Sequence, residues 1–368
     1  MEQEAHLRDK LISVCRQFRF PGEVLDFRML PGGQINTTCA VTLSDGTQTG
    51  AFLVQRVNPA VFPDPVGLMR NIDRVTEHII AKEGAEGSKG LCYYHTASGE
   101  NYVILGEREA AELWRVCDYI ENTVTFESGE GDARILNGAG RGFGRFLRQL
   151  RDFDPARLAE TIPHFHDTPY RMREFVRIAA EDPLGRGQRA QKEIYLILAG
   201  RAFADTFSRK MKQDALPVRV THNDTKLSNI LFRRDSLEPL AVIDLDTCMP
   251  GLVCYDFGDL VRSAARRTEQ DGGFRLDPDR FRACAEGFLS ETADFLTGAE
   301  LDSLAPGAAV VTLELASRFL ADYLNGDRYF RIEYPDHNLV RARRQLELYQ
   351  DMSLRLEEME EIIRAILR

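Results

Sequence analysis

Long apolar runs, paired cysteine spacings and an excess of basic residues are all missing from this sequence of 368 residues. No apolar stretch approaches the roughly 20 residues that a membrane span requires, and the polar start does not resemble a signal peptide. The seven cysteines are scattered without CxxC spacing, so we expect reduced thiols in a cytoplasmic protein, with neither a disulfide framework nor a zinc site. The net charge of −10 argues against binding to nucleic acid.

The sequence has an ordinary globular composition, with 43% hydrophobic and 28% charged residues. Its length allows one large domain or two modest ones, with a substantial core. Composition therefore sets only the broad class, and the motifs must carry the rest.

Side chains that can act in catalysis or bind a metal are most concentrated in residues 218–259. Val218 and Val220 alternate with polar neighbours, which predicts a short strand leading to His222. Three polar side chains follow with the spacing Asp-x-Lys-x-x-Asn, and a hairpin then returns to an acid at the end of its second strand; these residues are Asp224, Lys226, Asn229 and Asp244.

Phosphoryl transfer requires this combination of groups. A carboxylate at Asp224 can accept the proton of an acceptor hydroxyl, and Lys226 can offset charge on the transferred group. Mg²⁺ prefers oxygen ligands and keeps several waters, so Asn229 and Asp244 would suffice beside the phosphates of ATP. We expect His222 to have a structural role, bonding the backbone of the loop. The alternative is an acidic surface hairpin without chemistry.

The segments 222–229 and 242–247 resemble the aminoglycoside phosphotransferase-type kinases. Within that superfamily they are most similar to N-acetylhexosamine 1-kinases, which phosphorylate the anomeric hydroxyl of sugars. Further matching segments span most of the chain: 52–58, 114–116, 119–122, 164–168, 249–251, 255–259, 318–320 and 337–339. The resemblance implies a two-lobed, protein-kinase-like α+β fold, with an antiparallel-sheet N-lobe in residues 1–120 and a mostly helical C-lobe in residues 121–368.

The N-terminal third reads as a helix followed by a sheet. Apolar spacing predicts a helix over 5–18 and strands over 24–30, 38–43 and 51–57. Gly32 and Gly33 stand between the first two strands, where backbone N–H groups can approach a phosphate. The pair alone equally fits a plain hairpin turn. Gln34 follows, at a position where the resembled family has a histidine, which implies a place in the acceptor site.

Two further features of this lobe bear on the nucleotide. Only one of Gln55 and Arg56 can face the cleft, because neighbouring strand residues point to opposite sides. We favour Arg56 for the phosphates, with Glu77 of a predicted helix over 65–82 as its partner; a surface arginine is the alternative. After strands over 102–105 and 114–120, backbone groups of Cys117 and Tyr119 are the candidate adenine contacts, unless this is a simple lobe connection.

The C-terminal two thirds reads as mostly helical. We expect a glycine-rich loop over 127–144 leading to a helix near Phe146. Asp256 and Asp259 are expected to precede a helix and satisfy its first backbone donors. Helical spacing continues through three more segments: 191–212, 308–324 and 340–367.

The prediction of the residues that bind the acceptor rests mainly on the resemblance. It implies that Arg318 and Tyr329 contact a sugar, with Asp224 as the base, and that Ser263 replaces an aromatic beside the sugar. Asp167 reads as a helix cap, with a pocket-shaping histidine at 164 or 166 as the alternative. We therefore expect an ATP- and Mg²⁺-dependent sugar 1-kinase of undetermined oligomeric state. A kinase of another small alcohol (an aminoglycoside, choline or homoserine) and a nucleotide-binding pseudokinase are the alternatives.

Overall fold

A five-stranded antiparallel sheet forms the centre of the N-terminal part of the chain, in the order β1-β2-β3-β5-β4. The computed structural model describes residues 2–18, 20, 22–30, 35–84, 93–107, 111–214 and 216–368. Contacts divide the chain into two units. The N-terminal unit comprises Met1–Thr123, Arg157–Ile162 and Leu245–Cys248, and the C-terminal unit comprises Val124–Ala156, Pro163–Asp244 and Met249–Arg368.

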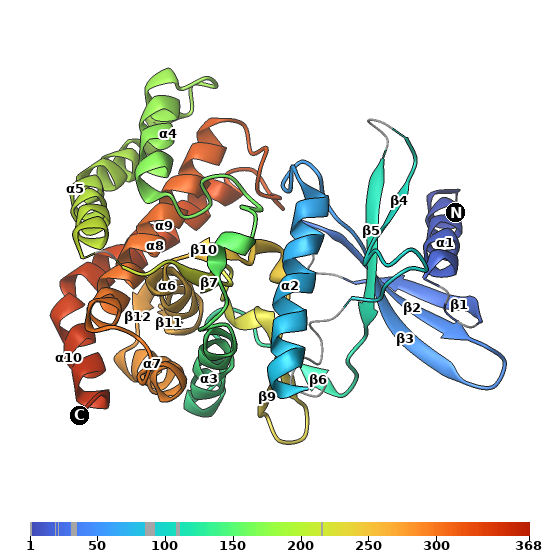
Figure 1. Ribbon diagram of the computed structural model, residues 1–368. Helices are drawn as coiled ribbons and strands as arrows, with labels where there is room; N and C mark the ends of the chain where they lie inside the picture. Colours follow the sequence, from blue (N-terminus) through green and yellow to red (C-terminus); the bar gives the residue numbers. More distant parts are fainter. Residues whose placement is uncertain are drawn as a thin grey trace. The chain divides into compact units, whose positions relative to one another are not determined.

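The N-terminal unit has one helix on each side of its sheet (Figure 1). Helix α1 packs Leu11 and Val14 against Val54 and Trp114 in one buried cluster. Helix α2 lies on the other side, where its Met69 contacts Arg115. The elements are α1 (Glu2–Gln17), β1 (Glu23–Met29), β2 (Thr37–Ser44), β3 (Thr49–Arg56), α2 (Pro65–Glu83), β4 (Val103–Leu105) and β5 (Glu112–Asp118).

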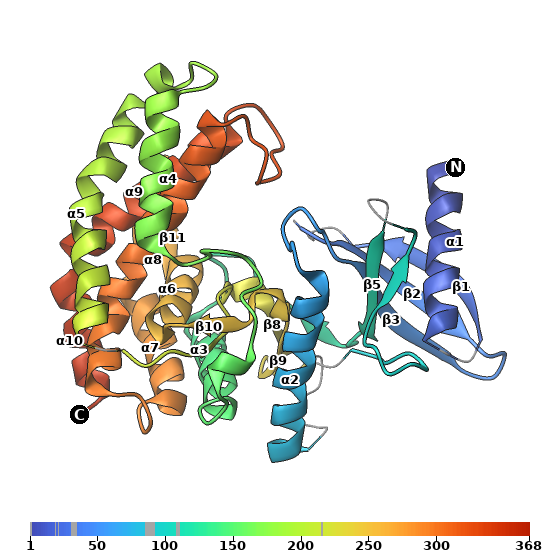
Figure 2. The same cartoon turned by 45° about the horizontal axis from the view of Figure 1, so that its top comes forward.

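Helices dominate the C-terminal unit, seen from two directions in Figures 1 and 2. They are α3 (Ala133–Gln149), α4 (Thr168–Glu181), α5 (Gln191–Gln213), α6 (Val253–Ala264), α7 (Pro278–Thr292), α8 (Gly298–Leu324), α9 (His337–Leu354) and α10 (Leu356–Ile366). The remaining strands, all short, are β6 (Thr123–Val124), β7 (Arg219–Thr221), β8 (Ile230–Arg233), β9 (Pro239–Val242), β10 (Met249–Gly251), β11 (Arg266–Thr268) and β12 (Phe274–Leu276).

Helix α8 is the central helix of this unit. Its 27 residues are long and apolar enough to cross a membrane by length and composition, contrary to the expectation that no stretch approaches that length. Inside the protein, 72% of its most apolar window is buried. A core helix surrounded by other helices accounts for this burial.

The glycine-rich segment is helical, so the predicted loop over 127–144 is wrong from Ala133 onward. A Cβ at Gly140 would overlap the carbonyl oxygen of Cys284, and one at Gly287 would overlap that of Asn137. The glycines therefore allow the backbones of α3 and α7 to approach closely. Glycine has a low helix propensity, but the tertiary packing of α3 against α7 outweighs that propensity. This packing cannot be inferred from a single sequence.

The predicted final helix over 340–367 is also wrong in one respect, because it is two helices. Arg355 leaves the helical conformation (φ −104°, ψ 14°) between α9 and α10. Its guanidinium pairs with Asp351 before the break and Glu358 after it.

The close approach of α3 and α7 gives a stability prediction. Gly287→Ala should lower the free energy of unfolding by about 1–3 kcal/mol, because the added methyl overpacks against the α3 backbone. Gly298→Ala is the matched control, since a Cβ there has open space around it. Urea unfolding of both variants provides the measurement. Equal stability of the two variants would contradict the packing account.

Candidate active site

A buried carboxylate fixes the backbone of the loop that follows strand β7. Asp256 of α6 accepts hydrogen bonds from the backbone N–H groups of His222 (2.9 Å) and Asn223 (2.7 Å). Thr225 donates its hydroxyl to the Asp256 carbonyl oxygen at 2.5 Å. Asn223 has a left-handed φ of 64°, a conformation that asparagine tolerates better than most residues. The loop is therefore clamped directly before Asp224.

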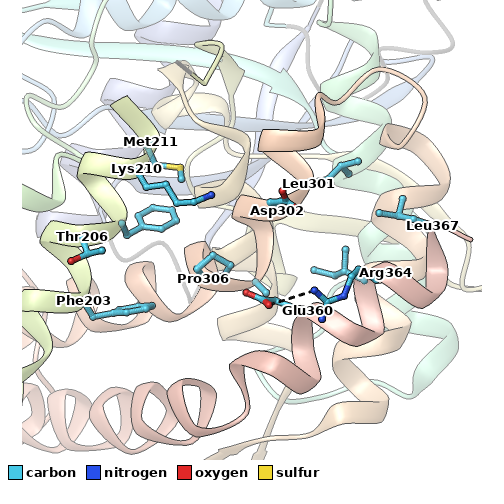
Figure 3. A pocket seen from close by; sticks show the side chains of 13 residues that line it. Phe203, Thr206, Lys210, Met211, Leu301, Asp302, Pro306, Glu360, Arg364 and Leu367 are labelled. Atoms are coloured by element: carbon cyan, nitrogen blue, oxygen red, sulfur yellow. Dashed lines mark ion pairs between the residues drawn. The ribbon is translucent and has the colours of Figure 1, made fainter. Parts of the chain in front are cut away.

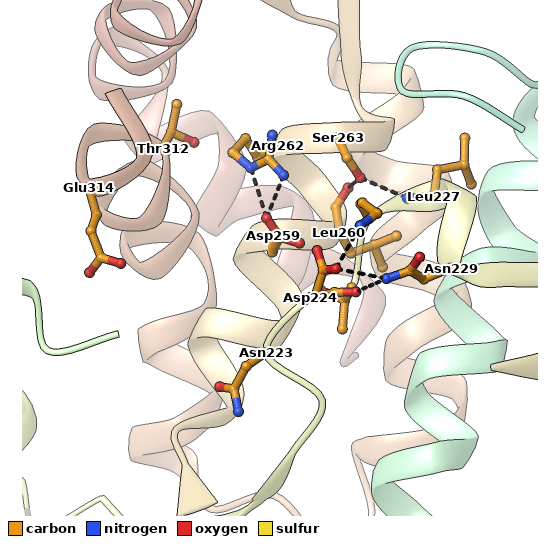
Figure 4. Close-up of polar contacts among 12 residues, drawn as sticks. Asn223, Asp224, Leu227, Asn229, Asp259, Leu260, Arg262, Ser263, Thr312 and Glu314 are labelled. Atoms are coloured by element: carbon orange, nitrogen blue, oxygen red, sulfur yellow. Dashed lines mark hydrogen bonds and ion pairs between the residues drawn. The ribbon is translucent and has the colours of Figure 1, made fainter. Parts of the chain in front are cut away.

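Asp224 is held in one orientation by two donors (Figure 4). Lys226 Nζ lies 2.7 Å from Asp224 Oδ2, and Asn229 Nδ2 lies 3.0 Å from the same oxygen and 2.8 Å from the Asp224 carbonyl oxygen. Burial opposes ionisation, but the attraction of Lys226 outweighs it and holds the pKa of Asp224 below its usual value. Asp224 is thus an ionised and oriented carboxylate, which is the state that a proton acceptor requires.

The predicted structural role of His222 is confirmed by its contacts. Its Nε2 lies 3.0 Å from the carbonyl oxygen of Ile243, and its Nδ1 accepts from the backbone N–H of Asp224 at 3.3 Å. The ring is fully buried between Phe143 and Phe146. His222 thereby ties the catalytic loop to the end of the following hairpin.

Asn229 and Asp244 offer the oxygen ligands that a divalent metal requires. The side-chain nitrogen of Asn229 is used as a donor to Asp224, which leaves its Oδ1 to face a metal. Ile243 donates its N–H to the Asn229 carbonyl oxygen at 2.9 Å, so Asp244 lies next in the chain to a residue bonded to Asn229. Asp244 is exposed. These two hard oxygen ligands fit Mg²⁺ completed by phosphates and waters.

The described residues contain no group of three or more His, Cys, Asp or Glu side chains able to hold a metal by themselves. The ion would therefore depend on the nucleotide phosphates for its remaining ligands. When bound, it would neutralise phosphate charge. Lys226 contributes positive charge at the same place, because Asp224 and Asp244 raise its pKa despite burial.

A second buried network supports the loop from α4 and α8. His166 Nδ1 lies 2.9 Å from Glu314 Oε1, and its Nε2 lies 3.2 Å from the carbonyl oxygen of Asn223. Both partners are acceptors, so both ring nitrogens carry protons and the ring is an imidazolium. Burial lowers the pKa of His166, but Glu314 raises it by more.

The capping role predicted for Asp167 is confirmed, since its carboxylate accepts from the Tyr170 N–H at the start of α4. Thr168, the next residue, donates to Glu314 Oε2 at 2.5 Å. This second bond fixes the carboxylate that holds His166. Sequence reasoning missed Glu314, because a lone acid on an apolar helix gives no motif.

Two predictions for α6 are wrong. Asp256 and Asp259 lie inside the helix and do not precede it. Asp256 binds loop donors, as described above, and Asp259 pairs with Arg262 at 2.6 Å (Figure 4). Ser263 is fully buried, accepts from the Leu227 N–H at 3.1 Å and donates to the Leu260 carbonyl oxygen. Ser263 thus supports the loop, and its implied place beside a sugar stays a prediction.

Arg318 and Tyr329 lie together, as the resemblance implied, with Arg318 Nη2 3.4 Å from the Tyr329 hydroxyl. Tyr329 is 42% exposed. Its backbone N–H donates to Asp322, which fixes the loop after α8. Contact of either residue with a sugar stays a prediction.

Arg56 does not pair with Glu77. It lies on the α1 side of the sheet, where it pairs with Glu112 at 2.7 Å and donates to Thr37. Gln55 points to the opposite face, because side chains alternate along a strand. Glu77 is exposed on α2. These contacts favour Gln55 over Arg56 for any role on the α2 side.

The buried cation on the α2 side of the sheet is Arg115, which the sequence did not single out. It is fully buried, pairs with Asp246 at 2.6 Å and donates to Gln55 Oε1 at 3.1 Å. Gln55 and Arg115 are cross-strand partners on β3 and β5. Only knowledge of this strand register would have identified the pair.

The remaining residues predicted to contact the nucleotide, and the predicted acceptor residue Gln34, differ in what the structure shows of them. Cys117 is buried in β5 opposite Leu53. The Tyr119 N–H donates to the Ala51 carbonyl oxygen at 3.2 Å, so it is not free for adenine. Gly32, Gly33 and Gln34 lie outside the described residues.

A cavity of about 430 Å³ lies between α5, α8 and α10 in the C-terminal unit (Figure 3). Its walls include Phe203, Leu301, Pro306 and Ile363, with the Glu360–Arg364 ion pair at one side. None of its described lining residues belongs to the predicted site.

The fold is that of protein-kinase-like phosphotransferases. The structure is similar to a microcompartment-associated aminopropanol kinase, with a TM-score of 0.63, 14% identity and coverage of 91% of this chain and 93% of that one. It is similar to the amicoumacin kinase hAmiN, solved with AMP-PNP, Ca²⁺ and Ami (TM-score 0.59, 12% identity, coverage 99% and 96%). It is also similar to the spectinomycin phosphotransferase APH(9)-Ia, solved with ADP and spectinomycin (TM-score 0.57, 12% identity, coverage 95% and 98%).

The structural similarity shows the fold, and the sequence identifies the family. Residues 26–286 match the model of the phosphotransferase enzyme family, APH. The chain belongs to this family. The predicted fold class and the aminoglycoside phosphotransferase-type resemblance are thereby confirmed.

The base assignment predicts the effect of removing one charge. Asp224→Asn keeps the shape but removes the proton acceptor, so turnover should fall by about 10²–10⁴-fold. ATP affinity, measured by calorimetry, should persist. Asp235→Asn, an exposed acid in the neighbouring hairpin turn, should leave turnover unchanged. An Asp224→Asn enzyme with most of its activity would refute the assignment.

The His166–Glu314 pair predicts a pH-dependent stability. The folded pKa of His166 is raised above 6.5 and that of Glu314 is lowered below 4.5. The pair therefore stabilises the fold fully between pH 4.5 and pH 6.5, the ordinary pKa values of the two groups. This stabilisation is lost as the pH rises through the folded pKa of His166. Glu314→Gln should cost about 3–5 kcal/mol in this window and progressively less at higher pH.

Urea unfolding at a series of pH values checks this expectation. Glu181→Gln is the control, because it breaks an exposed pair with Arg177 and should leave the stability nearly unchanged at every pH. A cost for Glu314→Gln that stays constant from pH 5.5 to beyond neutrality would show that His166 is not an imidazolium.

Proposed function

We propose that this protein transfers the γ-phosphoryl group of ATP to the anomeric hydroxyl of an N-acetylhexosamine or a related free hexose. The observation that carries the proposal is the Asp224 carboxylate held by Lys226 and Asn229 in a clamped loop. The sequence similarity to N-acetylhexosamine 1-kinases, which includes Arg318 and Tyr329, supplies the sugar. ATP and Mg²⁺ are the cofactors, and we place the reaction in the cytoplasm.

The proposed chemistry uses groups already described. The acceptor oxygen forms a bond to the γ-phosphorus as its proton passes to Asp224. The bond between the γ-phosphorus and the β–γ bridging oxygen breaks, and ADP leaves with that electron pair. Asn229 and Asp244 would hold the metal that neutralises the phosphates, and Lys226 would offset charge on the transferred group.

A second candidate is a kinase of another small alcohol. The structural similarity to an aminopropanol kinase favours it. The two candidates differ in acceptor charge, since aminopropanol is cationic at neutral pH and N-acetylhexosamines are not. A panel that varies this property separates them.

The test is phosphoryl transfer from ATP with Mg²⁺ to free sugars and to amino alcohols, read by phosphorus NMR. We expect a sugar product whose phosphorus couples to the anomeric proton, at a rate lowered by Asp224→Asn. Omission of the divalent metal should abolish transfer. Phosphorylation of amino alcohols without any sugar product would replace the proposal by the second candidate.

A further inference from the structure

Two arginines of the C-terminal unit lack the acidic partner that their neighbours have. Arg171 lies in the first turn of α4, and Arg318 lies on α8. Among the described residues neither forms an ion pair, whereas Arg177 pairs with Glu181 and Arg186 pairs with Asp327. In a protein with a net charge of −10, two unpaired cations on adjacent elements require an explanation.

Aromatic rings hold Arg318 without neutralising it. Its guanidinium carbon lies 4.9 Å from the ring centre of Phe165 and 5.6 Å from those of Tyr329 and Phe330. Such contacts orient a guanidinium while it keeps its full charge. The guanidinium of Arg318 is therefore able to bind a negatively charged ligand group.

Arg171 occupies an electrostatically unfavourable position. The first turn of a helix carries partial positive charge and disfavours cations. Burial lowers the pKa of Arg171, and the nearby charge of Arg318 lowers it further. Its Nη2 donates to the Pro163 carbonyl oxygen at 3.2 Å, while its buried Nε has no acceptor among the described residues. The charge of Glu314 partly offsets both effects. No acid among the described residues forms a direct ion pair with Arg171, so an anionic ligand would stabilise it further.

The acid whose charge acts on both arginines already has other hydrogen-bond partners. Glu314 lies one turn before Arg318 on α8, and its two oxygens accept from His166 and Thr168. Asp322, one turn after Arg318, accepts the backbone N–H groups of residues 328–330. Neither carboxylate is available to the arginine pair.

The pair lies next to the catalytic loop. The charge of Arg318 acts on His166, whose Nε2 contacts the carbonyl oxygen of Asn223, the residue before Asp224. A group bound by the arginines would thus be part of a molecule that reaches the base.

We propose that the acceptor carries an anionic group, a carboxylate or a phosphate, bound by Arg171 and Arg318 while its hydroxyl faces Asp224. The inference rests on the proposed transfer to an anomeric hydroxyl. It shifts the preferred acceptor from the neutral N-acetylhexosamines to acidic relatives of the free hexoses: hexuronic acids or hexose phosphates. Paired guanidiniums bind both anions through charge-assisted hydrogen bonds. The same charges repel acceptors that carry an ammonium group.

The test compares kcat/KM of the full-length enzyme, with ATP and Mg²⁺, for glucuronate, glucose 6-phosphate, glucose, N-acetylglucosamine and glucosamine. We expect at least one anionic sugar to exceed its neutral counterpart by about tenfold or more. Arg171→Gln should reduce that ratio by about 10–100-fold, the effect of losing one charged hydrogen-bonding group. The two anionic sugars distinguish a carboxylate site from a phosphate site.

Arg173→Gln is the matched control, because Arg173 is exposed on the same helix and contacts the same Tyr170 ring as Arg171. It should leave the ratio unchanged. A neutral hexose used as well as the anionic ones, with a ratio insensitive to Arg171→Gln, overturns this inference and leaves the proposed function standing. If no sugar of any charge is phosphorylated, the proposed function fails. Calorimetry with glucuronate and glucose 6-phosphate then measures the affinity of the protein for each anionic sugar. The proposed anion site is overturned if Arg171→Gln does not weaken that binding.

Discussion

Two backbone hydrogen bonds to the carboxylate of Asp256 are the constraint on which the active site depends. The loop from His222 to Asn229 contains a left-handed residue and a 3₁₀ turn, so it has little regular backbone bonding of its own. Buried N–H groups without acceptors are costly, and Asp256 satisfies two of them at once. Burial raises the pKa of Asp256 to about 6, so the carboxylate is still largely ionised at neutral pH.

Other supports act at different atoms of the same loop. His166 binds the carbonyl oxygen of Asn223, Ser263 accepts the N–H of Leu227, and Asn229 bonds both backbone and side chain of Asp224. They come from the segment before α4, from α6 and from the loop itself. The proposed base, held from several elements, keeps its orientation without substrate, which would lower the reorganisation needed for transfer.

Local sequence patterns predicted the elements whose determinants are local. The strands around Val54, the helix with Leu68 and Ile72, and the Asp-x-Lys-x-x-Asn motif rest on spacing that one sequence displays. The glycine-rich α3 was misread because its close approach to α7 is a tertiary property. Arg115 and Glu314 were missed for the same reason, since their partners lie 131 and 148 residues away in the chain. The predicted pairing of Arg56 with Glu77 was wrong because the alternation of strand side chains is visible in the sequence but the face that each side chain occupies is not.

The same long-range contacts explain how a family fold can accommodate different acceptors. The proposed base and metal ligands lie on a loop and hairpin whose supports come largely from α6, whereas Arg171 and Arg318 lie on α4 and α8. The His166–Glu314 pair and the Thr168–Tyr255 contact join the two sets. If Arg171 and Arg318 bind the acceptor as proposed, a change of charge at either position would alter the acceptor preference. Conversely, Glu314 cannot be replaced freely, because its carboxylate holds both His166 and Thr168 beside the loop.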